Sequence, residues 1–120
     1  MTLAADSQWS AARNELVPFI GERATALFAH AVAAGSGESA FAGSLRRGLI
    51  DSGEDLENPR VTETERLLID WGWMLGSNPD AIDDATRARL DASFTPALRG
   101  ILVRFAALTR DASRAADSSR

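Results

Sequence analysis

Apolar residues recur at intervals of three and four through almost the whole chain, which is the spacing of one face of an α-helix. Alanine is frequent and runs of β-branched residues are missing, so the same segments also have a high helix propensity. No segment shows the alternation of apolar and polar residues that a half-buried strand needs. The pattern predicts an all-α fold, a helical bundle of about six helices in a single domain over residues 1–120.

Three helices are predicted in the first half, at residues 7–17, 19–34 and 36–52. Pro18 separates the first two, because proline disfavours the helical conformation of the residue before it. Gly35 is the expected left-handed residue that ends the second helix, and Ser36 is the expected N-cap of the third. The third helix should end at Gly53, where a polar loop begins.

Local capping signals mark the helix starts in the second half. Thr62 and Glu65 have the spacing of a capping box, so a helix should begin there and run to about Gly76. Asn78-Pro79 and Thr95-Pro96 mark the starts of the next two helices, because each pairs a capping side chain with a proline suited to the first helical position.

The helix after Thr62 is apolar on two sides. Its first face is formed by Leu67, Leu68, Trp71 and Leu75. Ile69 and Trp73 lie on a different face, since each residue advances an α-helix by about 100°. This second face packs either on further helices of the same chain or on another subunit, where aromatic residues are favoured. Gly72 and Gly76, four positions apart, should allow close approach of a neighbouring helix.

Net charge and hydropathy limit the classes of partner that the sequence favours. The formal net charge is -4 and the pI is about 4.9, and all 13 basic residues are arginines dispersed along the sequence. This pattern argues against a nucleic-acid or anionic-membrane surface. The sequence has no apolar run long enough for a membrane span and no signal-peptide pattern at its start, so we expect a soluble, cytoplasmic protein. The polar tail over residues 112–120 is expected to fray.

The sequence contains no cysteine. This excludes disulfides, thiolate metal sites and thiol catalysis. No nucleotide or phosphate-loop motif is present, so no cofactor is expected. Asp80, Asp83 and Asp84 are explained by the favourable charge at a helix N-terminus rather than by a metal, and no metal site is predicted.

The second half of the chain resembles a known family. From Val61 to Leu108 the sequence has, in order, the Thr-x-x-Glu cap, a Leu-Leu pair, the Asn-Pro turn, the run 79–85, Leu90, Phe94 and an apolar closing helix. This order is similar to that of the carboxymuconolactone decarboxylase family, which includes alkylhydroperoxidase D-like proteins. A weaker likeness extends upstream over residues 24–35. The resemblance implies an all-helical domain that assembles into homo-oligomers, trimers or hexamers, with active sites near subunit contacts.

Peroxidases of that family carry a glutamate, eleven residues, and then Cys-x-x-Cys-x-x-x-His. Transferred to this sequence, the glutamate falls on Ala24, the cysteines fall on Ser36 and Ser39, and the histidine falls on Gly43. All four groups are missing. A serine hydroxyl is a far weaker nucleophile than a thiolate and cannot form the disulfide of a redox cycle, so peroxidase and disulfide-reductase activity are predicted to be absent.

His30 and Glu38 are the remaining candidates for chemistry. His30 is the only histidine, and it lies about 120° around the helix from Ala24, so a surface or interface role is favoured over acid-base catalysis. Glu38 is expected to be a solvated residue at a helix start, with proton transfer as the alternative. Arg46 and Arg47 are expected on a solvated face. Beside residues 36–43 we expect a small apolar cavity.

Three classes of function remain open. The first is a catalytically silent family member, an oligomeric scaffold or a small-molecule binding protein, and this class is favoured. The second is a cysteine-independent decarboxylase or related enzyme for an acidic, ring-derived substrate, using Glu38, His30 or an arginine. The third is a helical regulatory protein that binds a partner through the helix with Trp71 and Trp73, which is apolar on two sides, and through the arginine-bearing face.

Overall fold

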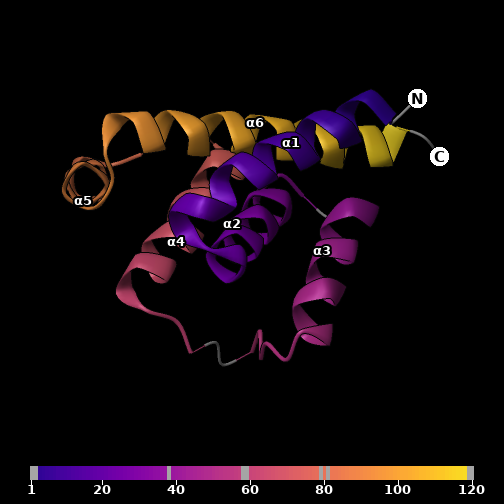
Figure 1. Cartoon of the computed structure of the whole chain (residues 1–120), viewed down its shortest axis with the longest axis horizontal. Helices are drawn as coiled ribbons and strands as arrows, with labels where there is room; N and C mark the ends of the chain where they lie inside the picture. The colour runs from indigo at the N-terminus through magenta and orange to yellow at the C-terminus, as the bar shows by residue number, and fades with distance from the viewer. Residues whose placement is uncertain (1–2, 38, 58–59, 79, 81, 119–120) are drawn as a thin grey trace.

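The computed structural model describes residues 3–37, 39–57, 60–78, 80 and 82–118, and this part of the chain contains six helices and no strand. The helices are α1 (Leu3–Ile20), α2 (Glu22–Gly35), α3 (Ala40–Asp51), α4 (Glu63–Ser77), α5 (Asp84–Ser93) and α6 (Pro96–Ser118) (Figure 1). The predicted all-α class is confirmed.

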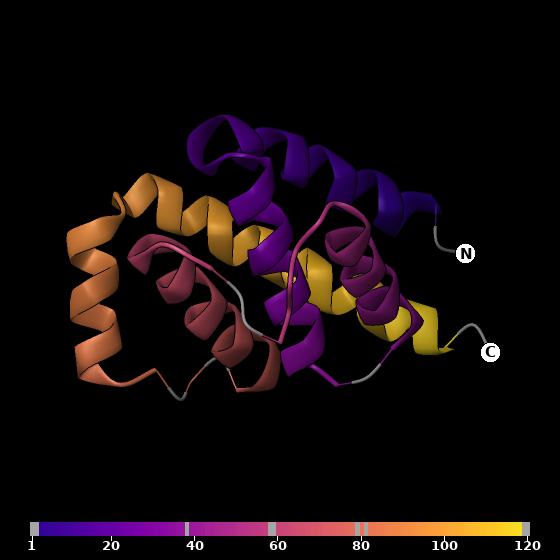
Figure 2. The same ribbon diagram turned by 90° about the horizontal axis from the view of Figure 1, so that it is seen from below.

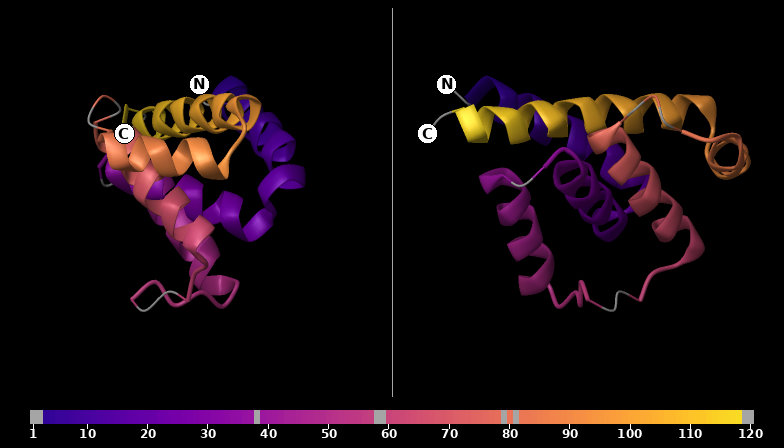
Figure 3. Two further views of the ribbon diagram at one scale, coloured as in Figure 1. Left: turned by 90° about the vertical axis from the view of Figure 1, so that its left-hand side faces the viewer. Right: turned by 180° about the vertical axis from the view of Figure 1, so that it is seen from behind.

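Helices α1 and α6 lie side by side and run in opposite directions, so the start of α1 and the end of α6 lie at the same end of the molecule (Figures 1 and 2). Helix α2 packs against both of them, with α3 on one side and α4 on the other (Figure 3). Helix α5 contacts α4 at the far end of α6. This arrangement makes α2 the central helix.

The core is built from the apolar stripes that the sequence predicts. Its largest fully buried apolar side chains are Leu16, Phe28, Val32, Leu68, Leu102 and Phe105. The Phe105 ring stacks on Trp9 with centroids 5.5 Å apart and on Phe28 at 6.2 Å. The Trp9 indole Nε1–H donates to Thr109 Oγ1 at 2.9 Å, so the polar atom of this ring is satisfied. Burying each such side chain contributes about 1.5–3 kcal/mol of transfer free energy.

Helices α2 and α4 cross at a very short distance, and glycines lie at the points of contact. A Cβ atom on Gly76 would lie only 2.1 Å from the Val32 carbonyl oxygen, and one on Gly35 would lie 2.4 Å from the Trp73 carbonyl oxygen. A Cβ atom on Gly72 would lie 3.1 Å from atoms of α2. The close approach predicted from Gly72 and Gly76 is therefore confirmed, and the neighbouring helix belongs to the same chain.

The predicted helix break at Pro18 is wrong. Helix α1 continues past Pro18, which lies in its last turn, so the missing N–H removes a hydrogen bond only near the helix end. The Val17 carbonyl still accepts a hydrogen bond from the Gly21 N–H at 2.7 Å. Gly21, with φ of 88°, is the residue that ends the helical conformation. Helix α2 therefore begins at Glu22 and not at residue 19.

The predicted roles of Gly35 and Ser36 are also wrong. Gly35 is still helical, because it is the close contact with α4, and the left-handed residue is Gly37, with φ of 119°. Ser36 follows the end of α2, and its hydroxyl donates back into the last turn at 2.9 Å. The N-cap of α3 is Ser39, whose hydroxyl accepts from the Ala42 N–H at 3.0 Å. Helix α3 consequently begins at residue 40 instead of 36.

Two capping signals are confirmed in the second half. Thr62 Oγ1 accepts from the Glu65 N–H at 3.1 Å, and the Glu65 carboxylate accepts from the Thr62 N–H at 2.8 Å, which completes the capping box. Thr95 Oγ1 accepts from the Leu98 N–H at 3.2 Å at the start of α6. The end of α3 at Gly53, with φ of 96°, is confirmed as well.

The predicted cap at Asn78 is wrong. Asn78 follows the end of α4, and Pro79 lies outside the described residues. Helix α5 begins later, at Asp84, because the Asp83 carboxylate caps it by accepting from the Thr86 N–H at 2.7 Å. The sequence contains capping side chains at both places, and in the structure the Asp83 carboxylate is the one that starts the helix.

The fraying predicted for residues 112–120 is wrong for residues 112–118, which are helical, and residues 119 and 120 lie outside the described residues. Helix α6 extends to Ser118, and both Ala112 and Ser113 are buried. The packing of α1 along α6 extends the ordered helix beyond the point where its sequence becomes polar.

Candidate functional site

Of the four positions carried over from the thiol peroxidase motif, Ala24 lies apart from the other three. Ala24 is near the start of α2 and Ser36 follows its end, so twelve residues of helix, roughly 18 Å of axial rise, separate them. The hydroxyls of Ser36 and Ser39 are used in the helix-end hydrogen bonds described above. Gly43 is exposed on α3. Glu38 lies outside the described residues, so its predicted role stays a prediction.

The pronounced depressions on the described chain lie elsewhere. None of five such depressions is lined by Ser36, Ser39 or Gly43, so the apolar cavity expected beside residues 36–43 is not among them. Ala24 borders one of about 390 Å³, beside the end of α5 and the start of α6.

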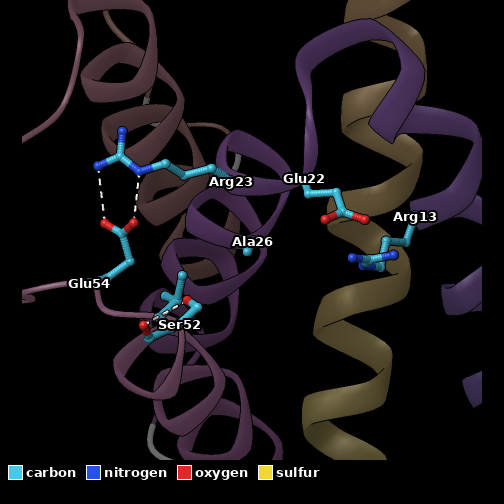
Figure 4. A pocket seen from close by; sticks show the side chains of 7 residues that line it. Arg13, Glu22, Arg23, Ala26, Ser52 and Glu54 are labelled. Carbon is cyan, nitrogen blue, oxygen red and sulfur yellow. Dashed lines mark hydrogen bonds and ion pairs between the residues drawn. The ribbon is translucent and has the colours of Figure 1, made fainter.

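One depression, between α2 and the end of α3, is polar (Figure 4). Arg23 forms a paired hydrogen bond with the Glu54 carboxylate, at 2.8 and 3.0 Å, and a further one with Glu65 at 2.8 Å. It also donates to the Arg60 carbonyl oxygen at 2.6 Å. The hydrogen bond from Arg23 holds the pKa of Glu54 below its usual value. Because Arg23 is saturated by these partners, we interpret this network as a structural link between α2, α4 and the loop that joins α3 to α4.

A second, apolar depression lies between α2 and α4 and has a volume of about 240 Å³. We call it the His30 cleft. It is lined by Leu27, His30, Ala31, Ala34, Leu56, Arg66, Ile69 and Trp73. The sequence points separately to His30 and to the second apolar face of the helix after Thr62. In the structure these two features form opposite walls of one cleft.

The His30 imidazole is half-buried in this wall. Burial lowers its pKa, and the nearby positive charge of Arg46 lowers the pKa further. At neutral pH the imidazole is therefore uncharged, with one nitrogen as donor and one as acceptor. Among the described residues no side chain or backbone group forms a hydrogen bond with it. Its polar atoms are free to bind a ligand.

Trp73 forms the opposite, open wall. It is 53% exposed, whereas Trp71, two residues earlier on α4, is only 3% exposed. The two indoles point about 200° apart around the helix. Ile69, on the same side as Trp73, is partly buried. The first apolar face of α4, which includes Trp71, is thus buried in the core. The second face, with Ile69 and Trp73, is only partly covered by other residues of the chain.

Leu56 and Arg66 are the residues of this cleft that the sequence did not single out. Leu56 belongs to the polar loop after Gly53, and a leucine in such a segment is a signal that the loop packs on something apolar. Arg66 looks like an ordinary exposed position of α4. Only the crossing of α2 and α4 brings it to the mouth of the cleft.

The other candidate groups have structural surroundings. The hydrogen bonds from the Thr86 hydroxyl and N–H lower the pKa of Asp83, as expected for a helix cap. Across the described residues no group of three or more His, Asp or Glu side chains is arranged to hold a metal ion. Arg46 and Arg47 are exposed, as predicted.

Comparison with protein-family models, with curated proteins and with solved structures found no match to this chain. In the part of the chain that the structure describes, every helix is too short or too polar to span a bilayer.

Proposed function

We propose that this protein binds a small aromatic molecule in the His30 cleft and does so without thiol chemistry, as a catalytically silent relative of the carboxymuconolactone decarboxylase family. The observation that carries the proposal is the convergence of His30, Ile69 and Trp73 on one apolar cleft. The family assignment is supported by the sequence order from Val61 to Leu108, together with the all-helical fold.

The walls indicate the chemistry of the ligand. Most of the lining side chains are apolar, and the exposed face of Trp73 offers a surface for ring stacking. His30 and Arg66 supply a few polar contacts, which is the usual composition of a small-molecule site. A volume of about 240 Å³ fits a molecule of one or two fused rings with a hydroxyl or carbonyl group.

Binding is favoured over catalysis by the surroundings of His30. A catalytic imidazole is normally oriented by a carboxylate or carbonyl partner, and none contacts His30 in the described chain. The charged group that acts on the pKa of this imidazole is instead a cation, the guanidinium of Arg46. A neutral imidazole without an orienting partner is suited to a hydrogen bond with a ligand.

Assembly is a second candidate function, favoured by the exposure of Trp73. A half-exposed indole beside an apolar cleft is typical of an interface, and the family resemblance suggests trimers or hexamers. Light scattering should then give a mass of three or six chains for the native protein and a smaller one for Trp73→Glu. A native protein that stays monomeric at high concentration would reject this candidate and leave ligand binding untouched.

Isothermal titration with 2-naphthol at pH 7.5 tests the binding proposal. We expect saturable binding with one site per chain, weakened about tenfold in Trp73→Ala because ring stacking and apolar contact are lost. Val103→Ala is the matched control, since Val103 is similarly exposed, at 45%, but lies on α6 away from the cleft. No binding by the folded protein, or equal binding by native protein and Trp73→Ala, would refute the proposal.

A further inference from the structure

A groove on the other side of α4 is not explained by the proposed function. It lies between α4, α5 and α6 and has a volume of about 540 Å³. We call it the α5–α6 groove. It is lined by Trp71, Ile82, Arg87, Leu90, Pro96, Arg99, Gly100 and Val103. Because Trp71 and Trp73 point to opposite sides of α4, this groove and the His30 cleft are separate sites.

The surface of the groove is apolar and open at Gly100. Leu90 is buried beneath it, and Val103 is 45% exposed at its edge. A Cβ atom on Gly100 would meet nothing within 4 Å, so no packing contact inside the chain requires a glycine there. Glycine weakens a helix interior, and its place in α6 leaves space above the apolar surface.

The polar groups of the groove are donors and positive charges. Arg87 is exposed, and no hydrogen bond or ion pair joins its guanidinium group to the described residues. Arg99 reaches Asp91 through one terminal nitrogen, but its Nε is buried without an acceptor. The Trp71 indole Nε1 is also buried without an acceptor in the described chain. Unsatisfied buried donors are rare in proteins and call for an explanation.

We infer that the α5–α6 groove binds a small carboxylic acid with an apolar chain or ring. The carboxylate pairs with the guanidinium groups of Arg87 and Arg99, which match its planar geometry. The apolar body lies over Leu90 and Val103 in the space that Gly100 leaves. The two guanidinium groups favour an anion, because among the described residues Arg99 pairs with one carboxylate, that of Asp91, and the Arg87 side chain pairs with none. The apolar surface favours a ligand that also has an apolar chain or ring, in contrast to a simple inorganic ion.

Calorimetric titration of the full-length protein with octanoate at low ionic strength tests this inference. We expect one site per chain, with binding about tenfold weaker in Arg87→Gln because a charged hydrogen bond is lost. Octan-1-ol, which has the same chain without the charge, should bind at least about tenfold more weakly than octanoate. Arg47→Gln is the matched control, because it removes an exposed arginine on α3 and should bind as the native protein does.

Gly100→Leu provides a second, independent variant. Leucine is a better helix former than glycine, and a Cβ atom at this position meets nothing within 4 Å, so the variant should melt no lower than the native protein while its side chain fills the groove. We expect octanoate binding to be lost. No detectable binding to the native protein at about 1 mM octanoate, or native binding by both Arg87→Gln and Gly100→Leu, would overturn the inference.

His30→Gln and Trp73→Ala separate this inference from the proposed function. Both should bind octanoate as the native protein does, because they alter only the His30 cleft. Loss of octanoate binding in these variants would place the acid in that cleft and overturn the assignment to the α5–α6 groove. Weaker 2-naphthol binding in these variants, with octanoate binding retained, would support both sites.

Discussion

Gly76 sets how closely two helices approach. A Cβ atom at position 76 would lie only 2.1 Å from the Val32 carbonyl oxygen. The close crossing of α2 and α4 therefore depends on the absence of a side chain at Gly76. Because the Val32 oxygen belongs to the backbone and not to a flexible side chain, a larger residue at position 76 can be accommodated only if a whole helix moves.

Gly76→Ala should therefore destabilise the protein although alanine is the better helix former. We expect a loss of about 2 kcal/mol in the free energy of unfolding, because the strain of overpacking exceeds the gain in helix propensity. Gly48→Ala is the control, since a Cβ there meets nothing within 4 Å, and it should gain about 0.5–1 kcal/mol. Urea denaturation measures both, and equal effects of the two substitutions would contradict the close crossing.

His30 should make the free energy of unfolding depend on pH in the range where a histidine side chain titrates. Its pKa is lowered in the folded protein, so the unfolded chain takes up the proton more readily. The contribution is fully present above about pH 6.5, the usual histidine value, and is lost as the pH falls below it. Carboxylates with lowered pKa values, Glu54 and Asp83, respond only at lower pH.

The measurement compares native protein with His30→Gln by urea denaturation between about pH 7.5 and 5.5. The native protein should lose stability on acidification in this range, and the variant should lose less, because His30 is the only histidine. Parallel curves for the two proteins would mean that His30 keeps an ordinary pKa and is not buried in the cleft wall.

At the scale of the helices, the sequence predicts best where a local hydrogen bond decides. The starts of α4 and α6 follow from Thr62 and Thr95, whose hydroxyls cap residues three positions later. The end of α2 could not be predicted in this way, because Gly35 and Gly37 are both suitable stops. Contact between Gly35 and Trp73 of another helix selects the second of them.

Removal of a local cap should thus have a local and predictable cost. Thr62→Ala is expected to lower the free energy of unfolding by about 1 kcal/mol, because the Glu65 N–H loses its acceptor. Thr64→Ala, an exposed substitution in the same turn, should change it by less than about 0.5 kcal/mol. Thermal or urea unfolding of the pair is the test, and a smaller loss in Thr62→Ala than in Thr64→Ala would argue against the capping box.

At the scale of the whole molecule, the sequence predicts the helical class and the apolar faces but not the site. His30 and Trp73 are 43 positions apart, and no local pattern relates them. They meet because glycines let α2 and α4 cross closely, and Leu56, from the loop between α3 and α4, lines the same cleft. Residues 36–43, where the family resemblance suggests a site, hold helix ends instead.

Because the sequence has no cysteine, the protein should lack thiol-dependent peroxidase activity. Purified protein mixed with an organic hydroperoxide and a dithiol reductant should show no turnover above a blank without protein, because no thiolate is available to attack the peroxide. Turnover above that blank would contradict the exclusion of thiol-type peroxidase activity.

The most direct test of the central claim is an NMR measurement of intermolecular contacts between bound 2-naphthol and the labelled protein. Ligand binding in the His30 cleft predicts nuclear Overhauser effects from the naphthol ring to the Trp73 indole and to Leu56 and Ile69, all of which line the cleft. Effects confined to other surfaces, or none from a protein that is folded and saturated, would contradict it.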